Sequence, residues 1–278
     1  MELNYNSAVS VKSFLEENGL GMRKRFGQNF LLNPSARQTL VDALDAAPGE
    51  SVWEIGPGLG AMTRLLLDRK LIVHAFEIDP GFIKALKTLF ANEAGFHLIE
   101  GDVLETWRNQ PPPPYLLGNL PYNIASVLLA DFIEQGCFFR RIVVTVQREV
   151  ALRMAAKPGT QDYSSFSVLC ASAYHVKPLV PIKSASFYPR PKVDSQGVLL
   201  ELREDAGVWP PCFYRLVRQL FSSRRKTIKN NLTAMLASQT LAVDALARCG
   251  LAGSGRAENM SFDSFTVLAK TMEDMGIL

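Results

Sequence analysis

The stretch Val52-Trp53-Glu54-Ile55-Gly56-Pro57-Gly58-Leu59-Gly60 contains the strongest indication of the fold. Its first four residues form a short apolar run that is typical of a strand, and residues 60–69 continue as an amphipathic helix. Glycines between a strand and a helix let the backbone turn tightly and approach a ligand without interference from a Cβ atom. The stretch therefore predicts a strand, a ligand-binding turn and a helix.

The same alternation continues downstream. We expect strands at residues 71–76, 96–99, 115–117 and 142–146, with a helix at residues 81–90. Strands that alternate with helices of this length imply βαβ units and a mostly parallel sheet. The predicted fold class is therefore α/β, with a doubly wound, Rossmann-like sheet.

Helical segments are expected on both sides of this sheet. Residues 11–18 are typical of a short amphipathic helix, and Asn33-Pro34 is typical of a helix start, with Asn33 as the N-cap. Residues 22–31 have no clear period and are expected to be extended. After the linker-like Val208-Trp209-Pro210-Pro211, helical periodicity dominates. We predict two domains: residues 1–205, with an N-terminal helical extension, and a smaller all-α domain of residues 206–278.

The composition is ordinary for a soluble globular protein, since 47% of the 278 residues are hydrophobic and 21% are charged. No apolar run reaches the roughly 18 residues of a membrane span, and the N-terminus lacks the features of a secretory signal. The four cysteines and three histidines are scattered, so no metal site is expected and a reducing cytoplasm is the expected location. A net charge of +3 does not by itself indicate a nucleic-acid partner.

Two acidic residues follow the glycines at the ends of the next strands. Glu77 lies about 20 residues after Gly56, near the spacing of a carboxylate that binds ribose hydroxyls. Asp102 is placed where it could accept a hydrogen bond from an adenine amine. A nicotinamide dinucleotide and S-adenosylmethionine (SAM) both agree with this pattern. The Gly-x-Gly-x-Gly spacing, and Glu54 two residues before the first glycine, resemble SAM-dependent methyltransferases.

A second motif, Asn119-Leu120-Pro121-Tyr122, offers groups for chemistry on the exocyclic amine of a base. The amine of adenine is a poor nucleophile because its lone pair is delocalised into the ring. The side-chain oxygen of Asn119 and the carbonyl of Leu120 can hold its hydrogens, and Pro121 restricts Leu120 to an extended conformation. Tyr122 can stack on the base, which contributes about 1–3 kcal/mol. The structural alternative is a strand end, a proline turn and a packed tyrosine.

Taken together, the motifs resemble the ribosomal RNA adenine N6,N6-dimethyltransferase family, and are most similar to its bacterial small-subunit (16S) enzymes. The resemblance rests, in order, on residues 26–31, 54–60, 77–79, 101–102, 119–124, 147–151, 157–159, 187–195 and 256–261. It spans about residues 12 to 270. The chain departs from the family pattern at Ala125-Ser126, Ala257 and Met260, which lie outside the proposed chemistry.

The resemblance implies a Rossmann-like SAM-dependent methyltransferase domain that dimethylates N6 of two adjacent adenosines in a 3′-terminal hairpin of 16S rRNA, in the small (30S) subunit, with S-adenosylhomocysteine as product. The implied cofactor-binding residues are Gln28, Asn29, Leu31, Glu54, Gly56, Gly58, Gly60, Glu77, Ile78, Asp102, Val103 and Asn119. The implied catalytic residues are Asn119, Leu120, Tyr122 and Phe187. Tyr122 and Phe187 would sandwich a base that is looped out or flipped. Neither a histidine nor a metal is implied.

Basic residues predict the RNA-binding surface. The candidates are Arg23, Lys24, Arg25, Lys192, Arg218, Arg224, Arg225 and Lys229. On a helix, Arg218, Arg225 and Lys229 would fall near one face. Such residues would bind phosphates without reading sequence, and their contribution would fall steeply with salt. The alternative is a solvated helix face.

Other functions agree less well with the motifs. An adenine N6-methyltransferase acting on large-subunit rRNA shares most of them, but residues 147–159 and Val193-Asp194-Ser195 favour the small-subunit type. Many DNA adenine methyltransferases carry Asp-Pro-Pro-Tyr, and an oxidoreductase would leave residues 119–122 without a role. A ribosome-assembly factor whose binding matters more than its chemistry stays open. We expect a monomer with no membrane association and no obligate protein partner.

Overall fold

The computed structural model describes residues 3–22 and 28–277. The chain divides into two compact units. Unit 1 comprises Met1–Leu129, Cys137–Ala151 and Val176–Leu202, and unit 2 comprises Ala130–Gly136, Leu152–His175 and Arg203–Leu278. The expected boundary at residue 206 lies close to Arg203, but the expected division did not include the two earlier segments of unit 2. Local periodicity cannot show which helices pack together, so these segments were not predictable from it.

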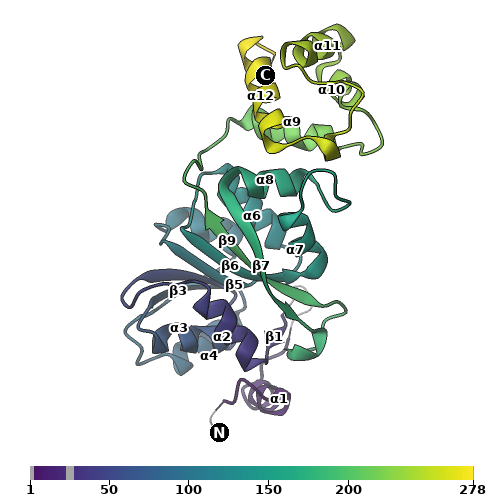
Figure 1. Cartoon of the computed structure of the whole chain (residues 1–278). Coiled ribbons are helices and arrows are strands. Elements are labelled where there is room, and N and C mark those ends of the chain that lie inside the picture. The colour runs from purple at the N-terminus through teal and green to yellow at the C-terminus, as the bar shows by residue number, and fades with distance from the viewer. Residues whose placement is uncertain (1–2, 23–27, 278) are drawn as a thin grey trace. The chain divides into compact units, whose positions relative to one another are not determined.

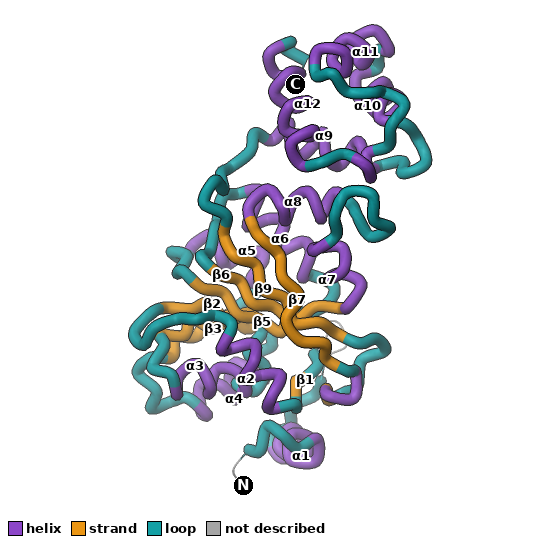
Figure 2. Tube along the Cα trace, in the orientation of Figure 1, coloured by secondary structure: helices purple, strands orange, loops and turns teal. Residues whose placement is uncertain are grey.

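A seven-stranded sheet has the order β4-β3-β2-β5-β6-β9-β7 (Figures 1 and 2). Its strands, in chain order, are β2 (Ser51–Ile55), β3 (Ile72–Glu77), β4 (Phe96–Glu100), β5 (Tyr115–Asn119), β6 (Arg141–Gln147), β7 (Tyr174–Ile182) and β9 (Ser195–Leu202). The pairs β2–β3, β2–β5, β3–β4 and β5–β6 are parallel, whereas β6 and β9 are antiparallel. The predicted α/β class with a mostly parallel sheet is confirmed.

Helices alternate with these strands along the chain. They are α2 (Pro34–Asp42), α3 (Ala61–Asp68), α4 (Pro80–Leu89), α5 (Val103–Thr106), α6 (Ala125–Glu134) and α7 (Arg148–Ala155). The core of unit 1 includes Leu40 from α2, Leu66 from α3 and Leu86 from α4, each at most 1% exposed. The strands and helices predicted between residues 51 and 146 are confirmed, with bounds that shift by one or two residues.

The N-terminal helices begin at polar caps. Helix α1 (Ala8–Glu17) begins earlier than predicted because the Ser7 side chain accepts a hydrogen bond from the Ser10 N–H. Helix α2 begins as predicted, since Asn33 Oδ1 accepts from the Ala36 N–H at 3.0 Å and Pro34 is the first helical residue. Between these helices, the short strand β1 (Phe30–Leu31) pairs antiparallel with β8 (Phe187–Tyr188). This pairing brings two motifs far apart in sequence into one small sheet.

Strands β7, β8 and β9 were not predicted. Strand β7 contains Pro178 and Pro181, which in sequence indicate a loop. Proline is tolerated in a strand at the end of a sheet because one edge of that strand has no partner to bond, and β7 is the last strand in the order. Of these three strands, β9 and β7 complete the seven-stranded sheet beyond β6, whereas β8 pairs with β1.

Unit 2 is built mainly from helices. They include α8 (Ser165–Ala173), α9 (Pro211–Phe221), α10 (Ile228–Leu236), α11 (Gln239–Arg248) and α12 (Phe262–Asp274). Phe213, Leu216 and Leu220 from α9 and Phe265 and Leu268 from α12 are fully buried. After Arg203, the described residues contain helices and no strand, as predicted. No helix of the described chain combines the length and apolar character that crossing a membrane requires.

Candidate active site

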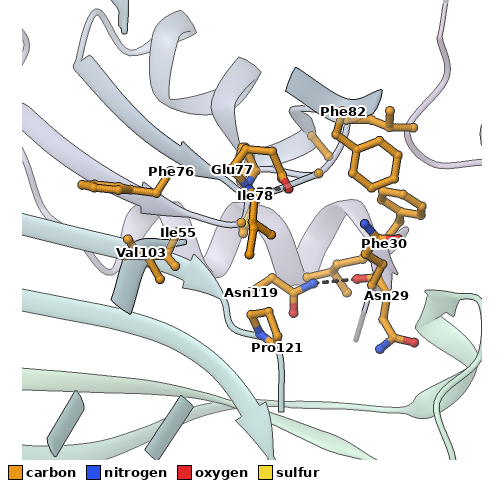
Figure 3. Close-up of a pocket in the computed structure, with 18 of the residues that line it drawn as sticks. Asn29, Phe30, Ile55, Phe76, Glu77, Ile78, Phe82, Val103, Asn119 and Pro121 are labelled. Carbon is orange, nitrogen blue, oxygen red and sulfur yellow. Dashed lines mark hydrogen bonds between the residues drawn. The ribbon is translucent and has the colours of Figure 1, made fainter. Parts of the chain in front are cut away.

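A pocket of about 290 Å³ opens in unit 1 where strands β2, β3 and β5 end (Figure 3). Ligands of open α/β sheets bind in this position, at the carboxyl ends of the strands. Ten of the twelve predicted cofactor residues line it: Gln28, Asn29, Leu31, Gly56, Gly58, Glu77, Ile78, Asp102, Val103 and Asn119. The structure therefore brings together residues from five motifs that are separated in sequence.

The glycine turn, residues 56–60, has a backbone that side chains rarely permit. Gly56, Gly58 and Gly60 have φ values of +68°, +60° and +87°. Gly56 and Gly58 line the pocket, whereas Gly60 does not. A Cβ atom on Gly60 would lie 2.3 Å from the ring of Phe90. Gly60 is therefore needed for the turn and for packing, and its predicted contact with the cofactor stays a prediction.

Glu54 lies outside the pocket lining. Its side chain is fully buried in β2, and Oε2 accepts a hydrogen bond from Thr63 Oγ1 at 2.6 Å. Oε1 has no hydrogen-bond partner among the described residues. Burial raises the pKa of Glu54 to about 7, although the Thr63 hydrogen bonds oppose this shift. Glu54 thus links β2 to α3 beside the pocket. Its direct contact with a cofactor stays a prediction.

Glu77 ends β3 and is held by the turn that follows it. Its Oε1 accepts hydrogen bonds from the backbone N–H groups of Ile78 at 3.0 Å and Asp79 at 2.8 Å. The side chain is buried, and burial raises its pKa to about 7 against the lowering effect of these bonds. A carboxylate held in this way, at the end of the second parallel strand, can accept from ribose hydroxyls.

Two neighbouring acids serve as helix caps. Asp79 Oδ1 accepts from the Gly81 N–H at 2.8 Å, and Asp79 Oδ2 accepts from Gln28 Nε2 at 3.1 Å. Asp102 begins α5, and its Oδ1 accepts from the Leu104 N–H at 2.9 Å. These hydrogen bonds fix the two carboxylates, and the Asp79 carboxylate also orients the Gln28 side chain on the pocket wall.

Asn119 ends β5 and faces the N-terminal motif. Its Nδ2 donates a hydrogen bond to the carbonyl oxygen of Asn29 at 2.7 Å, as the dashed line in Figure 3 shows. Because an amide has its donors on nitrogen and its acceptor on oxygen, this bond leaves Oδ1 as the acceptor. The neighbouring Leu120 donates its N–H to the Thr145 carbonyl at 3.2 Å, and Pro121 lines the pocket. The hydrogen bond between Asn119 and Asn29 was not predicted, because the two residues are far apart in sequence.

The two predicted stacking residues do not line this pocket. The Tyr122 hydroxyl is hydrogen-bonded to Ser195 Oγ at 2.7 Å. Phe187 is 3% exposed and belongs to the core of unit 1, where it pairs in register with Leu31. Leu120 is also buried, and its side chain does not line the pocket. The sandwich of a base between Tyr122 and Phe187 therefore stays a prediction.

The predicted face of three basic residues on one helix is wrong. Helix α9 ends at Phe221 and α10 begins only at Ile228, so Arg218 and Lys229 lie on different helices and Arg225 lies in the turn between them. The turn forms because the Thr227 side chain caps α10 by accepting from the Asn230 N–H. The prediction was wrong because it assumed one continuous helix from Arg218 to Lys229.

The other predicted RNA-binding residues differ in how they are engaged. Arg224 Nη2 donates to the carbonyl oxygens of Gln161 at 2.7 Å and Tyr163 at 3.3 Å, and pairs with Glu258 at 3.5 Å. Arg225 is exposed and makes no such bonds within the described chain. The remaining candidates divide into Arg218, which pairs with Glu134, the exposed Lys192, and Arg23, Lys24 and Arg25, which lie outside the described residues.

Several pocket residues were missed. They are Tyr5, Val11, Phe30, Arg37, Phe76, Phe82, Pro121, Asn123 and Ile124, among others. Phe30 and Phe82 meet edge to face at 5.6 Å between ring centroids. In sequence these aromatic residues are indistinguishable from core residues, and nothing local marked Arg37. In the described chain, no group of three His, Cys, Asp or Glu side chains could hold a metal ion.

Comparison with known proteins shows the family of the chain. Residues 19–274 match the model of the family described as Ribosomal RNA adenine dimethylase. The chain is 45% identical over 279 residues to Ribosomal RNA small subunit methyltransferase A of Treponema pallidum (strain Nichols), covering 97% of each chain. It is 43% identical to the protein of that name from Treponema denticola, covering 96% of this chain and 94% of the relative.

Two solved structures have similar folds. The dimethyladenosine transferase of Plasmodium falciparum has a TM-score of 0.79 and 26% identity, covering 88% of this chain and 98% of its own. The 23S rRNA methyltransferase ErmE has a TM-score of 0.65 and 22% identity, covering 87% and 99%. The second likeness establishes the fold alone.

Proposed function

The chain belongs to the ribosomal RNA adenine dimethylase family, and from that premise we propose that it dimethylates N6 of two adjacent adenosines in a 3′-terminal hairpin of 16S rRNA, within the small (30S) ribosomal subunit. It is an rRNA adenine N6,N6-dimethyltransferase of the SAM-dependent class. Its reaction contributes to ribosome biogenesis and takes place in the cytoplasm, with the enzyme acting as a monomer.

The residues of the pocket are suited to hold SAM. Glu77 would accept from the ribose hydroxyls and Asp102 from the adenine amine, while Gly56 and Gly58 let the ligand approach the backbone. When bound, SAM supplies a methyl group on a positively charged sulfur, which is a good leaving group. The main demand on the protein is therefore to position the acceptor amine.

The orientation of Asn119 supports this proposal most. The Asn29 carbonyl accepts a hydrogen bond from Asn119 Nδ2, so the amide oxygen of Asn119 is oriented to accept one hydrogen of the target amine. The Leu120 carbonyl would accept the other hydrogen. Two such acceptors favour a tetrahedral nitrogen whose lone pair is available for attack. After transfer the nitrogen is acidic and loses its proton to water or to one of these oxygens, so no strong general base is needed.

The base must leave any stacked helix to reach the pocket. Tyr122 and Phe187 would hold it between their rings, and the exposed Arg225 and Lys192 would bind phosphates of the surrounding RNA. In this proposal, unit 2 contributes to RNA binding and does not contact the reacting atoms.

The proposal is tested with labelled SAM and three substrates in parallel: unmethylated small subunits, unmethylated large subunits and DNA. We expect label only in the small subunits, on two adjacent adenosines. Label confined to large-subunit rRNA would identify the alternative activity. Tight binding to small subunits without any label would favour an assembly factor.

A further inference from the structure

A buried guanidinium forms part of the pocket wall. Arg37, on α2, is 5% exposed and lines the pocket together with Tyr5 and Leu31. It is the one cationic side chain among the described residues that line this pocket, where Glu77 and Asp102 are the acids. The pocket therefore has acidic groups at the ends of β3 and β4 and a positive group that is not part of those strands.

Within the part of the chain that the structure describes, Arg37 bonds only to neutral oxygens. Nη1 donates to the carbonyl oxygens of Leu31 at 2.7 Å and Tyr5 at 3.0 Å, and Nη2 donates to Asn6 Oδ1. Nε is buried and has no partner among the described residues. A guanidinium has five N–H donors, so these three bonds leave two, Nε–H and one on Nη2.

The positive charge of Arg37 is not neutralised within the described chain. None of the described carboxylates forms an ion pair with Arg37. Tyr5 is no counter-charge, because burial raises the pKa of its hydroxyl to about 12. Burial lowers the pKa of Arg37, which agrees with an uncompensated charge. Burying an unpaired charge reduces the stability of the fold by several kcal/mol, and a bound anionic group would offset that loss.

We propose that Arg37 is a specificity residue that recognises the carboxylate at the amino-acid end of the cofactor. The inference rests on the proposed cofactor. The two pocket acids suit donors, namely the ribose hydroxyls and the adenine amine, and neither would attract a carboxylate. Arg37 is bonded to Leu31, itself a predicted cofactor residue, so a carboxylate held near Leu31 would be stabilised by the guanidinium charge.

The test compares two ligands that differ only in the carboxylate. They are S-adenosylhomocysteine and its decarboxylated analogue, 5′-deoxy-5′-(3-aminopropylthio)adenosine, with binding measured by calorimetry. Wild-type protein should bind the first at least tenfold more tightly. Arg37→Gln removes the charge and leaves a shorter, neutral side chain that still carries N–H donors. It should weaken S-adenosylhomocysteine at least tenfold, about 1.4 kcal/mol, and change the analogue less than threefold.

Arg37→Met is the second charge-removing variant, and Arg69→Met is the matched control, because Arg69 pairs with Asp42 and does not line the pocket. Thermal unfolding confirms that each variant is folded. If both ligands weaken equally in the Arg37 variants, Arg37 only anchors the N-terminal segment and the inference is overturned. Equal affinity of wild type for the two ligands also overturns it. If wild type binds neither ligand, the proposed cofactor itself is wrong.

Discussion

The proposed cofactor side and the proposed target side of the site are built in different ways. On the cofactor side, the glycine turn and Glu77 are held by backbone geometry, with positive φ values and N–H groups aimed at the carboxylate. On the target side, Tyr122 is bonded to Ser195 and Phe187 is packed in the core. The proposed cofactor side is therefore held in place by backbone geometry, whereas the predicted stacking side chains make other contacts.

Asn119 lies where the two sides meet, and its substitution should have the largest effect. Asn119→Ala removes the oxygen proposed to accept from the target amine. We expect the single-turnover methylation rate to fall at least 100-fold, about 2.7 kcal/mol, while the protein stays folded. A fall of less than tenfold would remove Asn119 from amine activation. Asn92→Ala, at an exposed asparagine that does not line the pocket, is the matched control and should stay within threefold.

The stacking pair gives the next effect. Phe187→Leu preserves most of the core volume and removes the aromatic face, and Tyr122→Ala removes the other ring. We expect each to slow methylation about tenfold or more, since base stacking contributes roughly 1–3 kcal/mol, while SAM binding is retained.

Tyr122→Phe is the control for the hydroxyl, because it breaks only the bond to Ser195. It should keep most of the activity. Wild-type turnover in both Tyr122→Ala and Phe187→Leu would mean that these rings are structural and that the sandwich is not formed.

The buried carboxyl groups of Glu77 and Glu54 should make the free energy of unfolding depend on pH. Burial raises both pKa values to about 7, so the native state binds more protons than the unfolded state between about pH 4.5 and 7. Stability therefore falls as pH rises through this window, by up to about 3 kcal/mol for each group. Glu77→Gln and Glu54→Gln should each flatten the dependence of unfolding free energy on pH.

Ligand affinity separates these two acids. Hydroxyl donors favour an ionised Glu77, so wild-type affinity for S-adenosylhomocysteine should increase as pH rises through about 7. Glu77→Gln should lose this increase, and Glu54→Gln should keep it because Glu54 does not line the pocket. The same loss in both variants would contradict the distinction between them.

The smallest effects should come from the basic turn of unit 2. Arg225→Gln should lower the slope of log affinity for RNA against log salt by about 1 and leave stability unchanged. Arg224→Gln should instead destabilise by about 1 kcal/mol, because Arg224 bonds the Gln161 and Tyr163 carbonyls. Identical salt slopes for wild type and Arg225→Gln would exclude Arg225 from RNA binding.

The sequence predicted best where the signal is local. The glycine turn and the Asn33 cap follow from backbone preferences within a few residues, and both were identified. The placement of Glu54, Arg37 and Phe187 was not, because burial depends on which segments pack together. The prediction that Arg218, Arg225 and Lys229 share one helix face was wrong for a similar reason. Periodicity does not show where a helix is interrupted by a turn such as residues 222–227.

The reaction proposed for this site is the transfer of two methyl groups to the N6 amine of one adenosine. The most direct measurement follows the nucleosides of 16S rRNA by mass spectrometry during reaction of unmethylated small subunits with SAM. We expect N6,N6-dimethyladenosine to accumulate at two adjacent positions with wild-type enzyme and to be nearly absent with Asn119→Ala. Methylation at any atom other than N6, or undiminished dimethylation by Asn119→Ala, would contradict it.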